Sequence, residues 1–392
     1  MPIFLLGFNQ TSGEIRFGDR IAWIWRSGAY QNLLVVGIIA AGLFLLWHAS
    51  RRAYWRSAAR HIRKRRIAMV SLAILSIYVL IGLLDSVGWR GVQLDTEGKF
   101  VRTQDGKIVY APRSLSLLDR LCTRLRERTE KTYSAPLATH LYSKGTIQQP
   151  DGGVVRDYPP LQYQRSHLLG TDKVGNDVLY RALKGVRTAL IIGGFTTLIA
   201  IPFAIGFGVL AGYFGGWVDD IIQYVYTTLA SIPDVLLVVA FMLLFGQGLF
   251  NLCLILGIGS WTGLCRLLRG ETLKLRELEY IQAAEAFGVS RAKIILKHIV
   301  PNVMHIVLIS AILDFSGWIF AEAVLTYLQI GVEPTTGSWG NMINTARLEL
   351  ARDPIVWWNL AAAFLLMFGL VLPANLFGDA VRDALDPRLR TE

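Results

Sequence analysis

The stretch EYIQAAEAFGVSRAKIILKHIVPN, residues 279–302, lies between two long apolar runs and carries charges, paired alanines, a glycine and a proline. The residues from 276 to 287 favour helix, and Gly288 suits a left-handed helix end, because glycine accepts positive φ without strain. Ser290 can cap a second helix, and Pro301 opens the next apolar run. The stretch therefore predicts a helix, a sharp turn and another helix.

Two adjacent alanines leave one face of the first of these helices without large side chains. Ala283 and Ala284 have small side chains, which let the backbone of a partner approach closely. A short helix of this kind fits a groove on another protein. An ordinary amphipathic surface loop fits the spacing equally well, so the pattern alone leaves both interpretations open.

The composition is that of a membrane protein. The 392 residues are 53% hydrophobic, and they gather into runs near the length of about 20 residues that crosses a hydrocarbon core. The formal net charge of +11 comes from Lys and Arg beside these runs, which indicates membrane topology rather than nucleic-acid binding. The predicted spans are 33–47, which is an extra N-terminal candidate, 67–84, 187–212, 221–246, 248–266, 303–330 and 355–377.

The distribution of basic residues predicts the topology. Residues 51–66 contain eight Lys and Arg residues and no acid, so this linker is expected in the cytoplasm and the N-terminus outside. The polar stretch 85–185 follows one crossing and is expected outside, where residues 116–133 predict a short amphipathic helix. Counting onward places 267–302 in the cytoplasm, in agreement with its many basic residues, whereas 331–354 has only two arginines.

Several kinds of site are missing from the sequence. No phosphate-binding Gly-x-x-x-x-Gly-Lys-Ser/Thr loop is present, because TEGKF at 96–100 and QDGKI at 104–108 lack the first glycine and the hydroxyl. Cys122, Cys253 and Cys265 give neither a disulfide framework nor a zinc spacing. No metal-ligand cluster or nucleophile–base arrangement is found, so we expect no catalytic, cofactor or metal site in this chain.

The stretch at 279–302 resembles the cytoplasmic loop motif in permease subunits of binding-protein-dependent ABC importers. That motif is Glu-Ala-Ala, three residues, Gly, nine residues, Ile-x-Leu-Pro. The sequence departs from it by a glutamine in place of the glutamate, a histidine in place of the isoleucine and a valine in place of the leucine. The matching positions are Gln282, Ala283, Ala284, Gly288, His298, Val300 and Pro301.

Four further segments resemble the second permease subunit of dipeptide and oligopeptide importers, the peptide/nickel class. The resemblance implies an all-α polytopic membrane protein with a type I importer-like permease fold of about six core spans, here with one extra N-terminal span. It covers the chain from about residue 67 to the C-terminus, interrupted by the long outer loop. The segments are HLLGTDKVGNDVLYRALKGVRTAL (167–190), AGYFGGWVDD (211–220), FAEAVLTYLQIGVEPTTGSWGNMI (320–343) and NLFGDAVRDALDPRLR (375–390).

The predicted organisation has four parts. Residues 1–66 form an N-terminal extension that holds the extra span and the basic linker, and residues 67–84 form the first core span. Residues 85–185 form the extracytoplasmic loop region. Residues 186–392 form the core permease domain, with its cytoplasmic coupling loop at 267–302. The expected location is the bacterial inner (plasma) membrane, crossed several times.

The resemblance also implies partners. Because the chain lacks a phosphate loop, ATP and Mg are expected on a separate ABC ATPase, present as one or two subunits, whose groove accepts the helix 275–288. A second homologous permease subunit and an extracytoplasmic solute-binding protein are expected as well, beside the lipid bilayer and without nucleic acid. The chain itself is then a permease subunit and not an enzyme. The expected ATPase-coupling residues are Gln282, Ala283, Ala284, Gly288 and Pro301.

Polar residues inside the apolar runs are candidates for a translocation path or for a seam between subunits. Ser231, Pro233 and Asp234 interrupt one run, and irregular backbone at membrane depth is tolerated only against protein or a water-filled cavity. Asp314 and Glu322 lie about 80° apart around one helix and share a broad face. Carboxylates within spans are candidates for function, although pairing at a seam explains them too.

A stand-alone ion-coupled secondary transporter or channel is the alternative function. It requires groups that bind the coupling ion and usually two repeated halves, and the sequence contains no convincing internal repeat. Within the importer family the solutes range from peptides to nickel and peptide-like antibiotics. The sequence does not choose among them, because a separate binding protein usually makes that choice.

Overall fold

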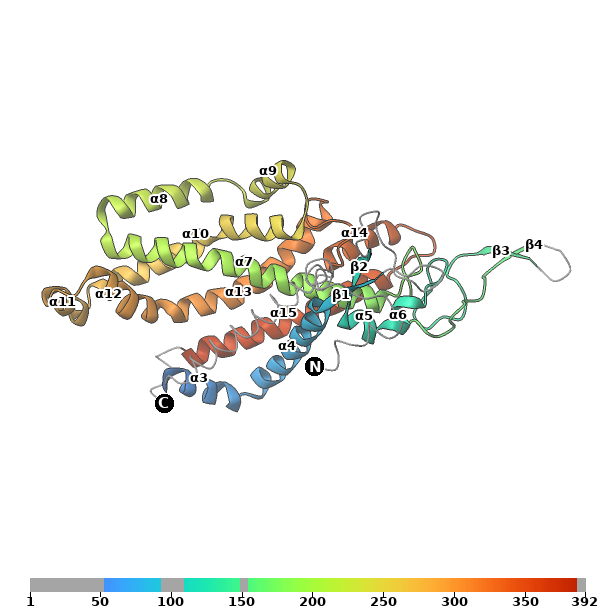
Figure 1. Cartoon of the computed structure of the whole chain (residues 1–392), viewed down its shortest axis with the longest axis horizontal. Helices are drawn as coiled ribbons and strands as arrows, with labels where there is room; N and C mark the ends of the chain where they lie inside the picture. The colour runs from blue at the N-terminus through green and yellow to red at the C-terminus, as the bar shows by residue number, and fades with distance from the viewer. Residues whose placement is uncertain (1–52, 93–108, 149–153, 386–392) are drawn as a thin grey trace, which may run out of the picture. The chain divides into compact units, whose positions relative to one another are not determined.

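The computed structural model describes residues 53–92, 109–148 and 154–385, and Figure 1 shows the helices and strands that they form. The predicted extra span at 33–47 lies outside these residues. The described residues divide into two compact units, one that includes 53–56, 79–92 and 109–128 and another that includes 57–78, 129–148 and 154–385.

Five helices of the described residues are long and apolar enough to cross a membrane. The first, with 21 residues, extends about 32 Å, which matches a hydrocarbon core of about 30 Å. Each long predicted core span corresponds to one of them, apart from residues 221–246. The five are α4 (Arg66–Ser86), α7 (Val178–Phe214), α10 (Leu249–Arg276), the helical run Arg291–Tyr327 and α15 (Trp358–Leu385).

The predicted span 221–246 is two helices rather than one. Helix α8 (Gly216–Ala230) and helix α9 (Asp234–Phe245) meet at a bend of 82°. Pro233 has no N–H to donate and disfavours helical backbone at Ile232, so the helix ends before it. If the bent pair counts as one span, the described residues contain up to six spans, in line with the predicted number of core spans.

Glycines allow the two central helices to pack closely. Helix α7 packs on α10, and Gly208 and Gly212 of α7 lie four residues apart on the shared face. A Cβ on either glycine would lie 2.7 Å from a backbone oxygen of α10, that of Cys265 or Arg269. Small residues at this spacing are typical of close helix packing in membranes.

The long run Arg291–Tyr327 contains a change of helix type. It begins as α12 (Arg291–Ile294), passes through a π-helical turn, η2 (Ile295–Ile299), and continues as α13 (Val300–Tyr327). Pro301 lacks an N–H and its ring would clash with the carbonyl of Lys297 in a regular α-helix, so the wider π turn relieves that conflict. Pro301 lies in the first turn of α13, as the sequence predicted, although the helical run continues through this boundary without a break.

The outer loop region holds short elements that the all-α class did not predict. Within the first unit β1 (Gly88–Val92) pairs antiparallel with β2 (Tyr110–Ser116), and in the second β3 (Gly145–Gln148) pairs with β4 (Val154–Asp157). The predicted helix at 116–133 is shorter and broken at Cys122. It consists of α5 (Leu117–Leu121), which begins with a capping box between Ser116 and Asp119, and α6 (Thr123–Glu127).

Three further helices complete the described chain. They are α3 (Ala53–Lys64), α11 (Glu279–Ala286) and α14 (Trp339–Glu349). Each is too short to cross a membrane, so each lies in a segment that connects spans or precedes them.

Candidate functional site

The helix of the predicted coupling loop is α11. The sequence predicted one helix from 276 to 287, but α10 ends at Arg276 and α11 begins after Leu278. The two-residue break lets α11 take a direction of its own at the end of α10. Figure 1 shows α11 and α12 at one end of the helical bundle.

The end of α11 has the geometry of a Schellman motif, as the sequence predicted at Gly288. The backbone of Gly288 has φ +74°. Its N–H donates to the carbonyl of Glu285 at 2.9 Å, and the N–H of Val289 donates to the carbonyl of Ala284 at 3.0 Å. Val289 and Ala284 both pack on the same apolar cluster. The next helix, α12, begins after Ser290, whose side chain makes no capping hydrogen bond.

The inner face of α11 is anchored in the bundle by an apolar contact. Ile281 is fully buried, and it shares a cluster with Ile294, Ile299 and Val303 of the long helical run. A buried isoleucine of this kind contributes about 2 to 5 kcal/mol relative to alanine. Ile281 therefore anchors α11 to the helical run Arg291–Tyr327.

Two hydrogen bonds hold the same helix to two different spans. The Tyr213 hydroxyl at the end of α7 donates to Glu285 Oε1 at 2.6 Å. The Asn302 amide of α13 donates to the Tyr280 hydroxyl at 3.1 Å. A third bond, from Arg276 Nη1 to the carbonyl of Tyr213 at 3.2 Å, joins the end of α10 to α7. Helix α11 is thus bonded to α7 and α13, and the end of α10 beside it is bonded to α7.

The outer face of α11 is open. Gln282, Ala283 and Ala286 are exposed, and the side chain of Phe287 is 87% exposed. Ala284, in contrast, is half-buried against the apolar cluster of Ile281. The two alanines of the predicted smooth face therefore lie in different environments, and Ala283 is the one available to a partner.

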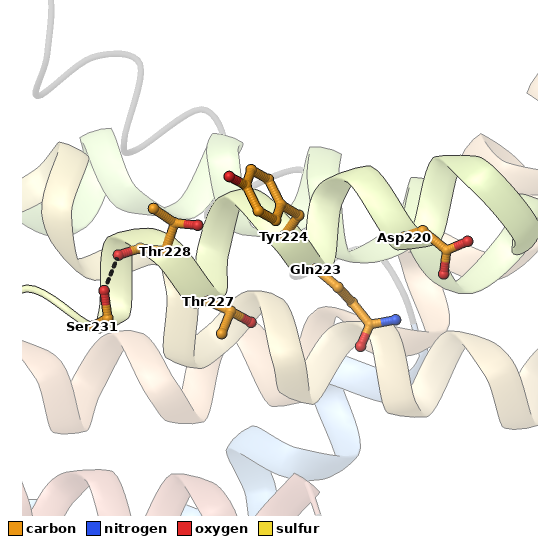
Figure 2. A pocket seen from close by; sticks show the side chains of 6 residues that line it. All are labelled: Asp220, Gln223, Tyr224, Thr227, Thr228 and Ser231. Atoms are coloured by element: carbon orange, nitrogen blue, oxygen red, sulfur yellow. Dashed lines mark hydrogen bonds between the residues drawn. The ribbon is translucent and has the colours of Figure 1, made fainter.

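A shallow, open hollow follows helix α8 up to the bend, and its lining residues, which Figure 2 shows, are polar although most of the lining surface is apolar. Its volume is about 560 Å³. Sequence reasoning found only Ser231, whose hydroxyl donates to the carbonyl of Thr228 at 2.7 Å. The recurrence of polar residues every three or four positions could have identified the others. The hollow is lined by Asp220, Gln223, Tyr224, Thr227, Thr228 and Ser231.

The other two predicted path residues at the bend lie at the start of α9. Pro233 occupies the N-cap position, and its carbonyl accepts hydrogen bonds from the N–H groups of Leu236 and Leu237. Asp234 is exposed and is the first residue of the helix, where a negative charge is favourable beside the helix dipole. Its position at the start of the helix therefore has a structural explanation.

Asp314 and Glu322 both lie in α13, but their side chains differ in burial. Asp314 is exposed, whereas Glu322 is only 3% exposed. The Thr326 hydroxyl donates to Glu322 Oε1 at 2.9 Å. The backbone of Gly340 in α14 lies so close that a Cβ there would be 2.8 Å from the same oxygen. Glu322 thus joins α13 to the first turn of α14 within this chain.

The segment from 167 to 190 builds the start of α7. Asp177 occupies the N-cap position and accepts a hydrogen bond from the Tyr180 N–H at 3.0 Å. Its other oxygen lies 2.9 Å from Nδ1 of the buried His167. The Trp358 indole of α15 donates to the carbonyl of Thr171 at 2.9 Å. These residues fix the beginning of one span against another.

A second polar cluster lies beside α14. Glu349 is buried and accepts hydrogen bonds from the Tyr133 hydroxyl at 3.1 Å and from the Asn359 amide at 2.6 Å. Burial raises the pKa of the Glu349 carboxyl, and the hydrogen bonds from Asn359 and Tyr133 oppose that rise. Burial and then the Glu349 carboxylate raise the pKa of Tyr133. Sequence reasoning gave no signal for this cluster.

Residues 204–391 match the family described as "Binding-protein-dependent transport system inner membrane component". The chain is also 36% identical to the oligopeptide transport system permease protein OppC of Haemophilus influenzae over 224 residues, which are 57% of this chain and 71% of that protein. The chain belongs to this family. The family predicted from the loop motif and the four further segments is thereby confirmed.

Two other relatives of this transport-component family extend the similarity. The dipeptide transport system permease protein DppC of Lactococcus lactis is 27% identical over 339 residues, 86% of this chain and 91% of that protein. The glutathione transport system permease protein GsiD of Pectobacterium atrosepticum is 36% identical over 228 residues, 58% of this chain and 74% of that protein.

Membership of the family settles the general function. The chain is a multi-pass membrane protein and a permease component of a binding-protein-dependent transport system, with an all-α polytopic fold. Relatives are permease subunits and not enzymes in their own right. A stand-alone ion-coupled transporter or channel is therefore set aside.

Proposed function

We propose that this chain is a permease subunit of the bacterial inner (plasma) membrane that moves peptides or peptide-like solutes. The relatives are permeases of oligopeptide, dipeptide and glutathione transport systems. The shared chemistry of these solutes is a short peptide backbone with N–H and C=O groups. The proposed partners are a second homologous permease, one or two ABC ATPase subunits that bind ATP and Mg, and an extracytoplasmic solute-binding protein.

The observation that carries the proposal is the arrangement of α11. Its outer face offers Ala283 and the exposed ring of Phe287, and its inner face is anchored through Ile281. A groove on an ATPase can bind the outer face without disturbing the inner one. When nucleotide-driven closure moves the groove, the anchored face transmits the displacement to the spans. Gln282 and Gly288 belong to this coupling element, and Pro301 belongs to the span that it moves.

The hollow on α8 supports a path for a polar solute. Thr227 and Thr228 make no side-chain hydrogen bond within the described part of the chain, and Tyr224 is 74% exposed. Hydrocarbon cannot satisfy such groups, so a water-filled passage is the environment that suits them. The residues that line the hollow supply hydroxyl groups, one amide and the carboxylate of Asp220, and none of them is a cation. That chemistry suits the uncharged N–H and C=O groups of a peptide better than an anion.

Asp314 and Glu322 take different parts in the proposal. Exposed Asp314 is proposed to face the polar path or to pair with the second permease. Glu322 is proposed to hold α13 and α14 together, because its carboxylate is already occupied within the chain.

The test of the proposal is transport by the reconstituted complex. Proteoliposomes with Mg-ATP on the ATPase side should accumulate a labelled dipeptide or oligopeptide only when binding protein and ATP are both present. Uptake that an ion gradient drives without ATP would contradict the coupling. ATP-driven uptake of nickel ions without peptide uptake would contradict the substrate class and leave the coupling intact.

A further inference from the structure

Helix α3 carries a cluster of basic side chains without acidic partners. Arg60, Arg63 and Lys64 are exposed. Among the residues that the structure describes, no ion pair or hydrogen bond of these three side chains is found. The neighbouring Arg65 differs, because its Nη1 lies 2.5 Å from Asp383 Oδ2 of α15. Within the described part of the chain, the side chains of Arg60, Arg63 and Lys64 are thus open to a ligand.

The helix lies at a membrane boundary. Helix α4 begins at Arg66, two residues after the end of α3, and is long enough to cross the hydrocarbon core. The Arg65–Asp383 pair and the hydrogen bond from the Tyr78 hydroxyl to the carbonyl of Leu366 at 2.9 Å show that α4 runs antiparallel to α15. The start of α4 therefore meets the end of a second span. The predicted topology assigns this boundary to the cytoplasmic side.

The basic residues of α3 occupy one side of the helix. At about 100° per residue, Arg60, Arg63 and Lys64 fall within an arc of about 100°, and Ile62 points about 160° away from Arg60 and Lys64. The half-buried Ile62 gives the opposite side its apolar contact, and the exposed Ala59 lies between the two sides. Membrane topology depends on the number of Lys and Arg residues beside a span. It does not require that they all lie on one side of a helix. Segregation is typical of helices that lie in the membrane surface.

We infer that α3 is a membrane-surface helix whose Arg60, Arg63 and Lys64 bind the phosphate groups of anionic lipids in the cytoplasmic leaflet. The apolar side enters the boundary between headgroups and acyl chains. The guanidinium groups can bind a lipid phosphate through two parallel N–H donors, and Lys64 adds a point charge. The helix would fix the start of α4 in the membrane surface. The inference does not depend on which solute is transported.

The test compares the lipids that stay bound to the full chain. Wild-type protein and the variant Arg60→Gln/Arg63→Gln/Lys64→Gln are reconstituted in an equimolar mixture of phosphatidylcholine and phosphatidylglycerol and then extracted in mild detergent. Each cation near a membrane surface strengthens binding about fivefold, so three together contribute on the order of a hundredfold. Mass spectrometry should find phosphatidylglycerol enriched on the wild type and not on the variant.

A matched control removes the same number of exposed cations from the outer region. The variant Arg156→Gln/Arg165→Gln/Lys173→Gln should keep the wild-type enrichment. A cysteine at Ser290, labelled from the cytoplasmic side only, checks that each variant keeps its topology. If the α3 variant inserts wrongly, the inference is tested on the wild type alone. The enrichment of phosphatidylglycerol on the wild type must then fall as the salt concentration rises.

Equal enrichment in the wild type and the α3 variant, or enrichment of the wild type that ignores salt, would overturn the inference. Loss of ATPase association with unchanged lipid binding would also overturn it. That result would assign the basic side of α3 to an acidic protein surface instead.

Discussion

Replacement of Ile281 by alanine removes the side chain that fixes α11 to the spans. Ile281 has no exposed surface and packs on Ile294, Ile299 and Val303. Loss of a fully buried isoleucine side chain costs about 2 to 5 kcal/mol, through lost burial and the cavity that remains. At about 3 kcal/mol the ratio of docked to detached α11 falls on the order of a hundredfold. The outer face keeps Ala283 and Phe287, so binding of an ATPase can persist.

The expected result is an uncoupled transporter. ATP hydrolysis should continue while peptide uptake per ATP falls, and the amides of α11 should exchange with solvent faster than in the wild type. Ile281→Val is the matched control, because it costs only about 0.5 to 1.5 kcal/mol and should retain most of the coupling. Unchanged amide exchange together with unchanged uptake per ATP in Ile281→Ala would refute the anchoring role of this side chain.

Three other predictions concern the loop end, the path and the outer cluster. Gly288→Val should weaken both ATPase association and uptake. A β-branched residue at φ +74° costs at least about 1 to 2 kcal/mol in backbone strain. Steric contact is not the cause, because no atom lies within 4 Å of the position that a Cβ on residue 288 would take. Gly288→Asn, which tolerates this backbone, should lose less in the same pull-down, and equal losses would contradict a conformational cause. Thr227→Val keeps the shape and removes a hydroxyl from the hollow, so peptide uptake should fall several-fold with ATPase association unchanged, and an unaltered uptake rate would exclude this hydroxyl from the path. The raised pKa of Glu349 means that the folded state binds its proton more tightly than the unfolded state, so this stabilisation is complete below the ordinary pKa of 4.5 and is lost as pH rises through the raised pKa. As pH rises above 4.5, the Tm of the wild type should therefore fall relative to the Tm of Glu349→Gln. A Tm difference between the two proteins that does not change with pH would contradict this prediction.

The sequence identified features that depend on backbone chemistry. A glycine after a helical segment predicts positive φ wherever it stands, and Gly288 adopts it. Pro233 within an apolar run predicts irregular backbone, and the bend between α8 and α9 lies there. These effects act over a few residues, so the surrounding fold has little influence on them.

Features that depend on packing could not be predicted. Ala283 and Ala284 are equivalent in the sequence, and only the burial of Ile281 decides which alanine is exposed. The strands β1 and β2 lack a clear alternation of polar and apolar residues, and their pairing joins residues 18 to 28 positions apart, so no local pattern predicted them. The π-helical turn before Pro301 was not predicted, because a proline can interrupt a helix as readily as it can widen one turn of it.

The predicted topology, the division into four parts and the roles of the site residues stay predictions. Labelling of single cysteines from each side of intact cells would test the topology. A cysteine at Ser290 should resist an impermeant reagent added outside, and its labelling would reverse the assignment.

The most direct measurement of the central claim is the amount of ATPase that co-purifies with Ala283→Arg. Ala283 is exposed on the outer face of α11, so the arginine should leave folding and membrane insertion intact and block only the close approach of a partner. Coupling through this face predicts that bound ATPase and ATP-driven peptide uptake are lost together. Full ATPase association with wild-type uptake in Ala283→Arg would contradict it.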